Sequence, residues 1–254
     1  MGVFPIKTNY KLKHRQNLTI IPISDLHAGS PFFNKEFFEY LLYQIRVTSD
    51  PKIIYLLGDE LDVPVKRQGN SSFQARESPN ETLEYLISKL KPFRKDIVGI
   101  VNSNHTTKRM LSEFNFNLSE VLGNSLDVPF STNIHHTLSI NGEPFTVFAS
   151  HGTKTSSQLH LMQGACQRST DYLDCDLVLM GHAHYLNFWS LPRLTRDGYK
   201  RRYYALCGHF LKYKDSYADV MGLKPNPEGF MKINVSKDLR VTGNLYNSDE
   251  VVYL

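Results

Sequence analysis

Short clusters of acidic, amide and imidazole side chains recur along the sequence, each directly after an apolar run. The clusters are Asp25/His27, Asp59, Asn104/His105, His151 and His182/His184. Carboxylate and amide oxygens and imidazole nitrogens bind divalent metal ions, and imidazole can also transfer protons. A single cluster of this kind is common by chance, but five in succession predict a metal-dependent hydrolase whose site is assembled from separate strands.

The apolar runs that precede the clusters have the length and composition of buried strands. They cover residues 18–23, 53–57, 97–101, 144–149 and 176–180. Because ligands bind outside the carboxyl ends of strands in open α/β sheets, we expect these five ends to meet. The one-residue spacing of Asp25 and His27 lets both side chains leave an extended strand end on the same side. Gly58 lets the backbone turn before Asp59, whose two carboxylate oxygens can bridge two cations.

Helical and further strand patterns surround these runs. An apolar stripe predicts a helix over residues 35–47, and Ser78, Pro79 and Glu81 form a capping box that begins a second helix. His135 and His136 are expected in a turn before the Asn141-Gly142 hairpin signal. After residue 176 the chain favours strands, which we expect at residues 187–191, 203–207, 230–235 and 241–246.

The motifs in order, D-x-H, G-D-x-x-D, N-H, H and G-H-x-H, resemble the calcineurin-like metallophosphoesterase superfamily across residues 25–184. The resemblance implies an α/β fold, a two-sheet β-sandwich flanked by helices (αββα), with a binuclear metal centre at the carboxyl ends of the strands. It also implies a ligand set. One metal would be held by Asp25, His27 and His184, the other by Asn104, His151 and His182, with Asp59 bridging the two.

The resemblance further implies a reaction. Two divalent ions clamp phosphate oxygens and lower the pKa of a bound water for attack on phosphorus. His105 is the candidate catalytic general acid, and Asp62 is expected to orient a ligand from behind rather than to bind metal. We expect manganese as the metal, although iron, zinc and nickel suit the same donors.

Two departures from the family pattern bear on the substrate. Thr106 stands where an acidic residue usually follows the histidine, which weakens the case for His105 as an acid. Asp62 is followed by Val63 and Pro64, not by the arginine and glycine of the Ser/Thr protein phosphatases. Because that arginine would grip a phosphomonoester dianion, its absence favours a phosphodiesterase acting on a nucleic acid or nucleotide. The alternatives are a phosphomonoesterase for a protein or metabolite, and a non-catalytic scaffold with this fold.

Two segments and one histidine are candidates for substrate contact. Residues 63–77 form a polar stretch with Lys66 and Arg67, which is either a phosphate-binding lip or a solvated loop. Residues 193–204 mix basic and aromatic side chains, beginning at Arg193, and suit either a nucleic acid strand or a solvated hairpin. His209 is either a phosphate ligand or an ordinary residue at a strand end.

Composition adds limits of a general kind. The 254 residues are 41% hydrophobic, which is enough for one domain over residues 1–254, with a motif-bearing core at 17–190 and a strand-rich part at 191–254. Three cysteines without C-x-x-C spacing predict a reducing compartment. Because no signal peptide or run of about 20 apolar residues appears, we expect a cytoplasmic protein without membrane contact.

Overall fold

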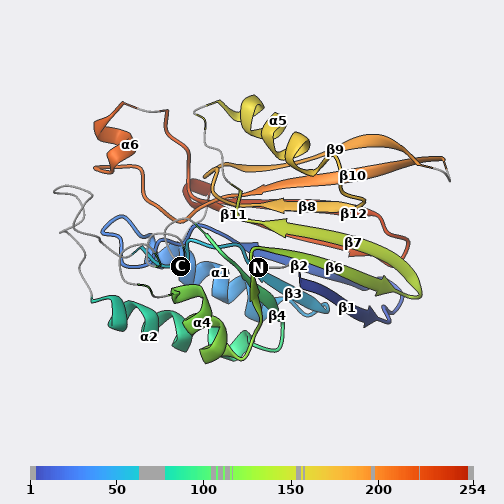
Figure 1. The fold of residues 1–254 in the computed structure, drawn as a ribbon, viewed down its shortest axis with the longest axis horizontal. Helices are drawn as coiled ribbons and strands as arrows, with labels where there is room; N and C mark the ends of the chain where they lie inside the picture. The colour runs from blue at the N-terminus through green and yellow to red at the C-terminus, as the bar shows by residue number, and fades with distance from the viewer. Residues whose placement is uncertain are drawn as a thin grey trace.

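Two six-stranded sheets make up the centre of the computed structural model (Figure 1). The structure describes residues 4–62, 78–103, 107, 111, 115, 117–152, 156, 158–195, 198–222 and 224–250. The first sheet has the order β12-β11-β2-β3-β4-β5. Its strands are β2 (Asn17–Ile23), β3 (Lys52–Leu56), β4 (Ile97–Val101), β5 (Phe130–Ser131), β11 (Gly229–Ser236) and β12 (Val241–Asn247).

The second sheet has the order β1-β6-β7-β8-β10-β9. Its strands are β1 (Phe4–Tyr10), β6 (Asn133–Ile140), β7 (Glu143–Ser150), β8 (Leu177–Met180), β9 (Leu186–Thr195) and β10 (Gly198–Cys207). Both sheets are mixed. Strands β2, β3, β4 and β5 run parallel in the first sheet, as do β7, β8 and β10 in the second. Parallel neighbours place their carboxyl ends at one edge, which is the edge where the sequence motifs fall.

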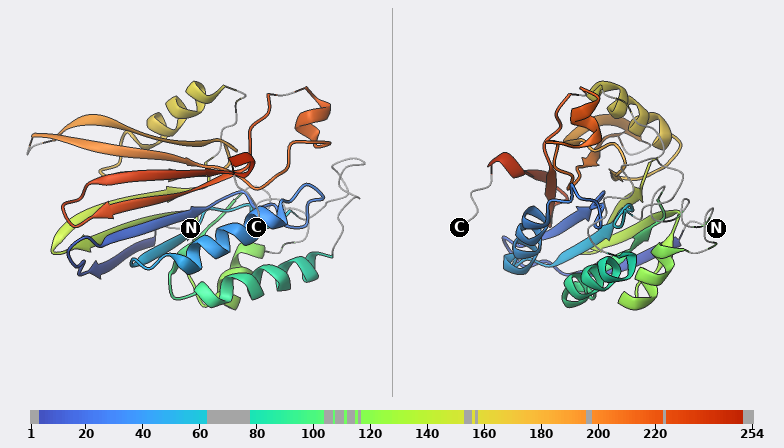
Figure 2. Two further views of the ribbon diagram at one scale, coloured as in Figure 1. Left: turned by 180° about the vertical axis from the view of Figure 1, so that it is seen from behind. Right: turned by 90° about the vertical axis from the view of Figure 1, so that its left-hand side faces the viewer.

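Helices cover the outer faces of both sheets (Figures 1 and 2). α1, α2 and α4 lie along the first sheet and α5 along the second, so the layers are helix, sheet, sheet and helix. The helices are α1 (Lys35–Val47), α2 (Pro79–Leu90), α4 (Leu118–Leu126), α5 (Leu159–Thr170) and the short α6 (Tyr217–Val220), with 3-10 turns η3 (Lys91–Phe93) and η5 (Ser248–Glu250). The expected two-sheet α/β sandwich is confirmed.

Three apolar clusters hold these layers together. One fills the space between the sheets, with Ile20 and Tyr55 from the first sheet against Val147 and Leu179 from the second. A second cluster packs α1, α2 and α4 on the first sheet, and a third packs α5 on the second. Strands covered on both faces need continuous apolar runs, which is why β2 is buried from Leu18 to Ile23.

Several sequence expectations are confirmed in detail. α1 spans the expected residues 35–47, and Ser78 and Glu81 form the predicted capping box at the start of α2. The expectation for the adjacent histidines was wrong: His135 and His136 lie within β6, where burial alternates along the strand. The Asn141-Gly142 turn does join β6 to β7.

The strands after residue 190 complete both sheets. β10 pairs with β8 in the second sheet, whereas β11 pairs with β2 in the first. The C-terminal strands therefore lie directly beside strands that carry the metal-ligand motifs. Among the helices in the described ranges, none combines the length and the apolar character needed to cross a membrane.

Candidate metal centre

Six of the predicted metal ligands gather where strands from both sheets end. Asp25 and His27 follow β2, and Asp59 follows β3, in the first sheet. His151 follows β7 directly, and the last two ligands follow β8, in the second sheet. Because β2 and β3 are parallel, as are β7 and β8, their ends meet at one edge of the sandwich.

The six side chains form two groups whose possible ligand atoms lie within 4.8 Å of one another. The first group is Asp25, Asp59, His151 and His182, and the second is Asp25, His27 and His184. Asp25 therefore belongs to both groups. Asp59, which we expected to bridge the metals, falls in the first group. Asn104, predicted as a further ligand, and the predicted general acid His105 lie outside the described residues.

Distances between donor atoms in these groups have the size that a shared metal ion requires. His184 Nε2 lies 3.2 Å from Asp25 Oδ1 and 3.3 Å from His27 Nε2. In the other group, His151 Nε2 lies 3.2 Å from Asp59 Oδ2. A tetrahedral site with bonds of about 2.0 Å separates its ligand atoms by about 3.3 Å.

The hydrogen bonds of His151 leave one ring nitrogen directed at the site. Its Nδ1 lies 2.8 Å from the carbonyl oxygen of Leu57, to which it donates in the neutral ring. Nε2 is then the atom with the lone pair, and it is buried without a hydrogen bond to the described part of the chain. Metal-bound histidines typically donate their second nitrogen in this way, so this residue fits a metal ligand.

Asp25 presents one oxygen to the site and anchors the other. Oδ2 accepts hydrogen bonds from the Ser24 hydroxyl and, at 2.8 Å, from the backbone N–H of His182. Oδ1 is buried and accepts no hydrogen bond within the described ranges. Gly181 allows the close approach, because a Cβ there would lie 2.1 Å from Ser24 Oγ. The anchored carboxylate thus connects the end of β2 with the end of β8.

The backbone at the site is unusual for residues with side chains. Five of the six gathered ligands adopt a left-handed conformation with φ between 49° and 62°, namely Asp25, His27, Asp59, His182 and His184. Such conformations are uncommon outside glycine, cost on the order of 1 kcal/mol or more each, and concentrate at functional sites. Backbone hydrogen bonds between the loop after β2 and the loop after β3 stabilise these conformations, including one from His27 N–H to Asp59 O at 2.8 Å.

The charges of these ligand side chains stabilise one another. Burial disfavours the charge of Asp25, but His184 and His27 outweigh it and hold the pKa of Asp25 well below its usual value. Burial alone would lower the pKa of His151, yet Asp59 and Asp25 raise it to about 9. A metal ion needs the neutral imidazole, so a metal bound here takes the place of a proton.

Asp62 and His209 lie around the ligands. Asp62 Oδ2 is 3.9 Å from His27 Nδ1, on the side of the ring away from His184. The His209 ring stacks on that of His184 at 4.9 Å between centroids, with an interplanar angle of 17°. Its Nε2 lies 3.1 Å from Asn226 O, and its Nδ1 accepts from Leu211 N. Both nitrogens are thus engaged, and burial lowers the pKa of His209 to about 3.

The structure does not bring the predicted substrate contact Arg193 to this cluster. Its guanidinium pairs with Asp174 at 2.6 Å and with Asp176 at 3.0 Å, before the first residue of β8. The ligands follow the last residue of β8, so Arg193 lies toward the opposite end of the sheet, about 30 Å of extended chain beyond His184. The other cationic candidates, Lys66 and Arg67, lie outside the described residues.

Sequence reasoning missed two residues of the site. Ser24 orients Asp25, and its only sequence signal is its place directly before the D-x-H motif. Glu60 is fully buried and accepts a hydrogen bond from Gly58 N at 2.8 Å, while burial raises its pKa to about 7. Nothing in the sequence distinguishes Glu60 from an exposed acidic residue, because only the tertiary structure buries it.

Solved structures similar to this chain include vacuolar protein sorting 29 from Cryptosporidium parvum, with 15% identity, a TM-score of 0.49 and coverage of 92% of this chain and 100% of that chain. A zinc complex of vacuolar protein sorting 29 from Entamoeba histolytica has 14% identity and a TM-score of 0.43, covering 90% and 98%. A predicted phosphoesterase from Streptococcus pneumoniae has 10% identity and a TM-score of 0.42, covering 91% and 98%.

No protein-family model matches the sequence, and no curated protein matches it. At these identities and TM-scores the similar structures carry no conclusion about activity. The function proposed below therefore depends on the side chains of the candidate metal centre.

Proposed function

We propose that this protein is a binuclear metal-dependent phosphodiesterase that acts on a nucleic acid or nucleotide. One observation carries the proposal: six carboxylate and imidazole ligands from two sheets converge in two groups that share Asp25. Divalent ions held there would supply positive charge for phosphoryl oxygens and a water of lowered pKa for attack on phosphorus.

The predicted ligands and the residues around them each have a role in this proposal. Asp25, His27 and His184 would hold one ion, and Asp59, His151, His182 and Asn104 would hold the other, with Asp25 within reach of both ions. The carbonyl of Leu57 keeps the His151 ring oriented, and Asp62 faces the outer nitrogen of His27. We assign protonation of the leaving oxygen to His105, which follows Asn104 in the sequence. Manganese is our proposed metal, and zinc, iron or nickel would suit the same donors.

Charge around the site supports a diester over a monoester. A monoester dianion needs an added cation beside the metals, and the sequence has Val63 where phosphatases of this resemblance carry arginine. Arg193, a candidate substitute, is paired with Asp174 and Asp176 toward the other end of the sheet. A phosphodiester carries one negative charge and needs no such cation.

A comparison of two aryl substrates tests the proposal. Protein loaded with manganese is assayed on bis(4-nitrophenyl) phosphate and on 4-nitrophenyl phosphate, and we expect a higher kcat/KM for the diester. A clear preference for the monoester would identify a phosphomonoesterase instead. Metal binding without hydrolysis of either substrate would identify a scaffold.

The variant Asp59→Asn guards against a contaminating hydrolase. It removes one charge from the first ligand group, and we expect activity to fall by at least about 100-fold. Asp238→Asn makes the same chemical change at an exposed position before β12 and should retain activity. Fractionation of expressing cells would test the cytoplasmic location that we propose from the reduced cysteines.

A further inference from the structure

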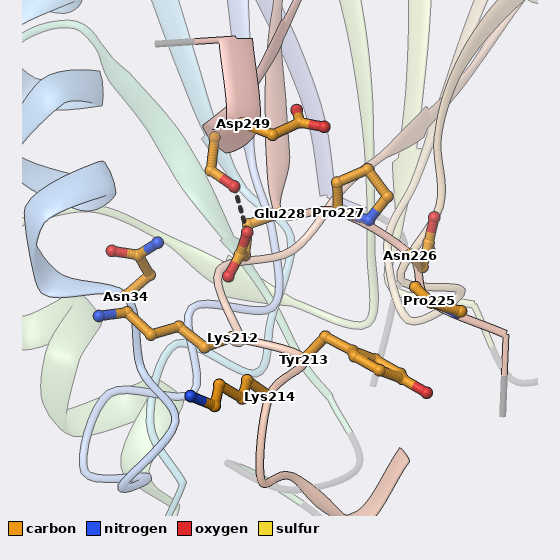
Figure 3. A pocket seen from close by; sticks show the side chains of 10 residues that line it. Asn34, Lys212, Tyr213, Lys214, Pro225, Asn226, Pro227, Glu228 and Asp249 are labelled. Carbon is orange, nitrogen blue, oxygen red and sulfur yellow. Dashed lines mark hydrogen bonds between the residues drawn. The ribbon is translucent and has the colours of Figure 1, made fainter. Parts of the chain in front are cut away.

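A pocket of about 480 Å³ lies between the segment that follows β10 and the segment that precedes β11 (Figure 3). Its volume falls within the range of pockets for small ligands and cofactors. None of the six gathered metal ligands lines it. The walls include Lys212, Tyr213 and Lys214 from one segment and Pro225, Asn226 and Pro227 from the other.

Two short routes connect this pocket with the candidate metal centre. On the first, the carbonyl of Asn226 accepts a hydrogen bond from His209, whose ring stacks on the metal ligand His184. On the second, Asn34 N–H donates to Phe210 O, and Phe210 N–H donates to the carbonyl of Asp25. A single residue therefore separates the pocket wall from a metal ligand on each route.

The pocket has a basic side and an aromatic side. Figure 3 shows the side chains of Lys212 and Lys214 extending toward the side of Asn34, and the ring of Tyr213 extending the opposite way, near Pro225. This alternation is that of an extended segment. Both lysines are exposed, and neither ammonium forms an ion pair with the residues that the structure describes. The pocket therefore offers two free cations at one end and a flat apolar surface at the other.

The acidic residues of the pocket come from other segments of its wall than the lysines. Glu228 is buried and accepts a hydrogen bond from the Ser248 hydroxyl, on the wall near η5. Asp249 is exposed beside it. These carboxylates can accept hydrogen bonds from amino groups of a ligand, whereas a phosphate would be repelled from them and drawn to the lysines.

We propose that this pocket binds one nucleoside monophosphate unit of the substrate, beside the unit whose phosphodiester is cleaved. The phosphate lies at Lys212 and Lys214, and the base lies on the ring of Tyr213, since aromatic rings stack with any base. This inference rests on the proposed function and narrows its substrate class to nucleotides longer than one unit.

Binding of a fluorescent adenosine monophosphate tests the pocket without reference to activity. Anisotropy is measured with full-length protein in EDTA, so that no metal contributes. We expect Lys212→Glu and Tyr213→Ala each to raise the Kd about tenfold, the size of one charge-assisted contact or one stacked base. Tyr213→Phe keeps the ring and should keep the affinity. The matched controls Lys237→Glu and Tyr172→Ala, at exposed positions outside the pocket, should also keep it.

A second measurement connects the pocket with the substrate. For a dinucleotide and manganese-loaded protein, we expect kcat/KM to fall about tenfold in Lys212→Glu and in Tyr213→Ala. Unchanged adenosine monophosphate affinity in both variants, or unchanged dinucleotide hydrolysis, would overturn the inference. Hydrolysis of bis(4-nitrophenyl) phosphate by the wild type separates the two proposals. If the wild type does not hydrolyse it, the proposed phosphodiesterase activity is wrong, whereas the binding of adenosine monophosphate still tests the pocket.

Discussion

Asp25 divides its two carboxylate oxygens between structure and ligand binding. Oδ2 accepts from the Ser24 hydroxyl and from His182 N, which fixes the rotamer. Oδ1 then faces His184 at 3.2 Å and His27 at 3.8 Å. Because this residue belongs to both ligand groups, its charge should matter to both metal ions.

Substitution of this carboxylate is the sharpest test at the residue scale. Asn tolerates the left-handed backbone of position 25, so Asp25→Asn should fold. We expect metal affinity to fall by more than about 100-fold at both sites. Loss of a residue that only hydrogen-bonds to a metal ligand lowers the affinity by about 10- to 100-fold. Isothermal titration calorimetry with manganese measures affinity and stoichiometry. Retention of two ions with wild-type affinity would contradict a shared role, and Asp238→Asn serves as the control.

Sequence reasoning located the six gathered side chains and the set of Asp25, His27 and His184, but not the place of Asp25 in the other group. Ligand types and strand-end positions follow from short motifs, which local sequence carries. Asp25 belongs to both groups because the edges of the two sheets lie close together in the fold. No local sequence pattern encodes the distance between these edges. The same limit explains His209, which donates to Asn226 O and accepts from Leu211 N–H, and Arg193, which the length of β9 places away from the site.

At the level of elements, the ends of β2 and β8 approach each other at Gly181. A Cβ at this glycine would lie 2.1 Å from Ser24 Oγ and 3.1 Å from Asp25 Oδ2. We expect Gly181→Ala to lower the free energy of unfolding by about 1 to 3 kcal/mol, as overpacking does, and to weaken metal binding. Urea unfolding and calorimetry measure the two effects.

A second substitution separates this steric cause from a general loss of stability. Ser24→Ala removes the hydroxyl that the new methyl group would meet. The double variant should therefore recover part of the stability that Gly181→Ala loses, relative to the Ser24→Ala parent. Strictly additive effects of the two substitutions would show that the clash lies elsewhere.

The elements differ in how well the sequence predicted them. α1 and α2 have strong apolar stripes and side-chain caps, and β4 ends where its apolar run ends. β6 was missed because His135 and His136 interrupt its apolar alternation. The hydrogen-bond partners of the buried His136 are Tyr55 on β3 and Thr8 on β1. Only the tertiary structure brings them together, so the sequence does not show that a histidine can be buried at this position.

For the molecule as a whole, metal ions should act as links between the two sheets. The ligands come from strands of both sheets, so the site exists only in the folded chain. At a free manganese concentration about 100 times the Kd, binding adds about 2.7 kcal/mol of stability. That corresponds to a rise in Tm of roughly 5 to 10 °C for a chain of this size. Differential scanning calorimetry with and without EDTA measures it, and an equal rise in Asp25→Asn would refute the mechanism.

A buried histidine gives the whole fold a dependence on pH. His136 Nδ1 lies 2.7 Å from Tyr55 Oη and Nε2 lies 2.9 Å from Thr8 Oγ1, while burial lowers the pKa of His136 from 6.5 to about 4. Between these values the unfolded chain binds a proton that the folded chain does not. Stability is therefore fully present above about pH 6.5 and falls as the pH is lowered toward 4, by about 2 to 3 kcal/mol.

Urea unfolding at pH 7 and pH 4.5, in EDTA, tests this dependence. Gln at position 136 can form hydrogen bonds but does not titrate in this range. The loss of stability between the two pH values should be smaller in His136→Gln than in wild type, even if the variant is less stable at both. Equal losses in the two proteins would assign the pH dependence to other groups.

The pairing of β11 with β2 also determines when the site can form during synthesis. Asp25 and His27 directly follow β2, yet the neighbour of β2 on one side is made of residues 229–236. On the ribosome, that edge of β2 stays open until residues 229–236 have been translated. Asp25 and His27 therefore stay without their partner His184, which is translated 157 residues after His27, and the ligand set can be completed only after β8 has been made.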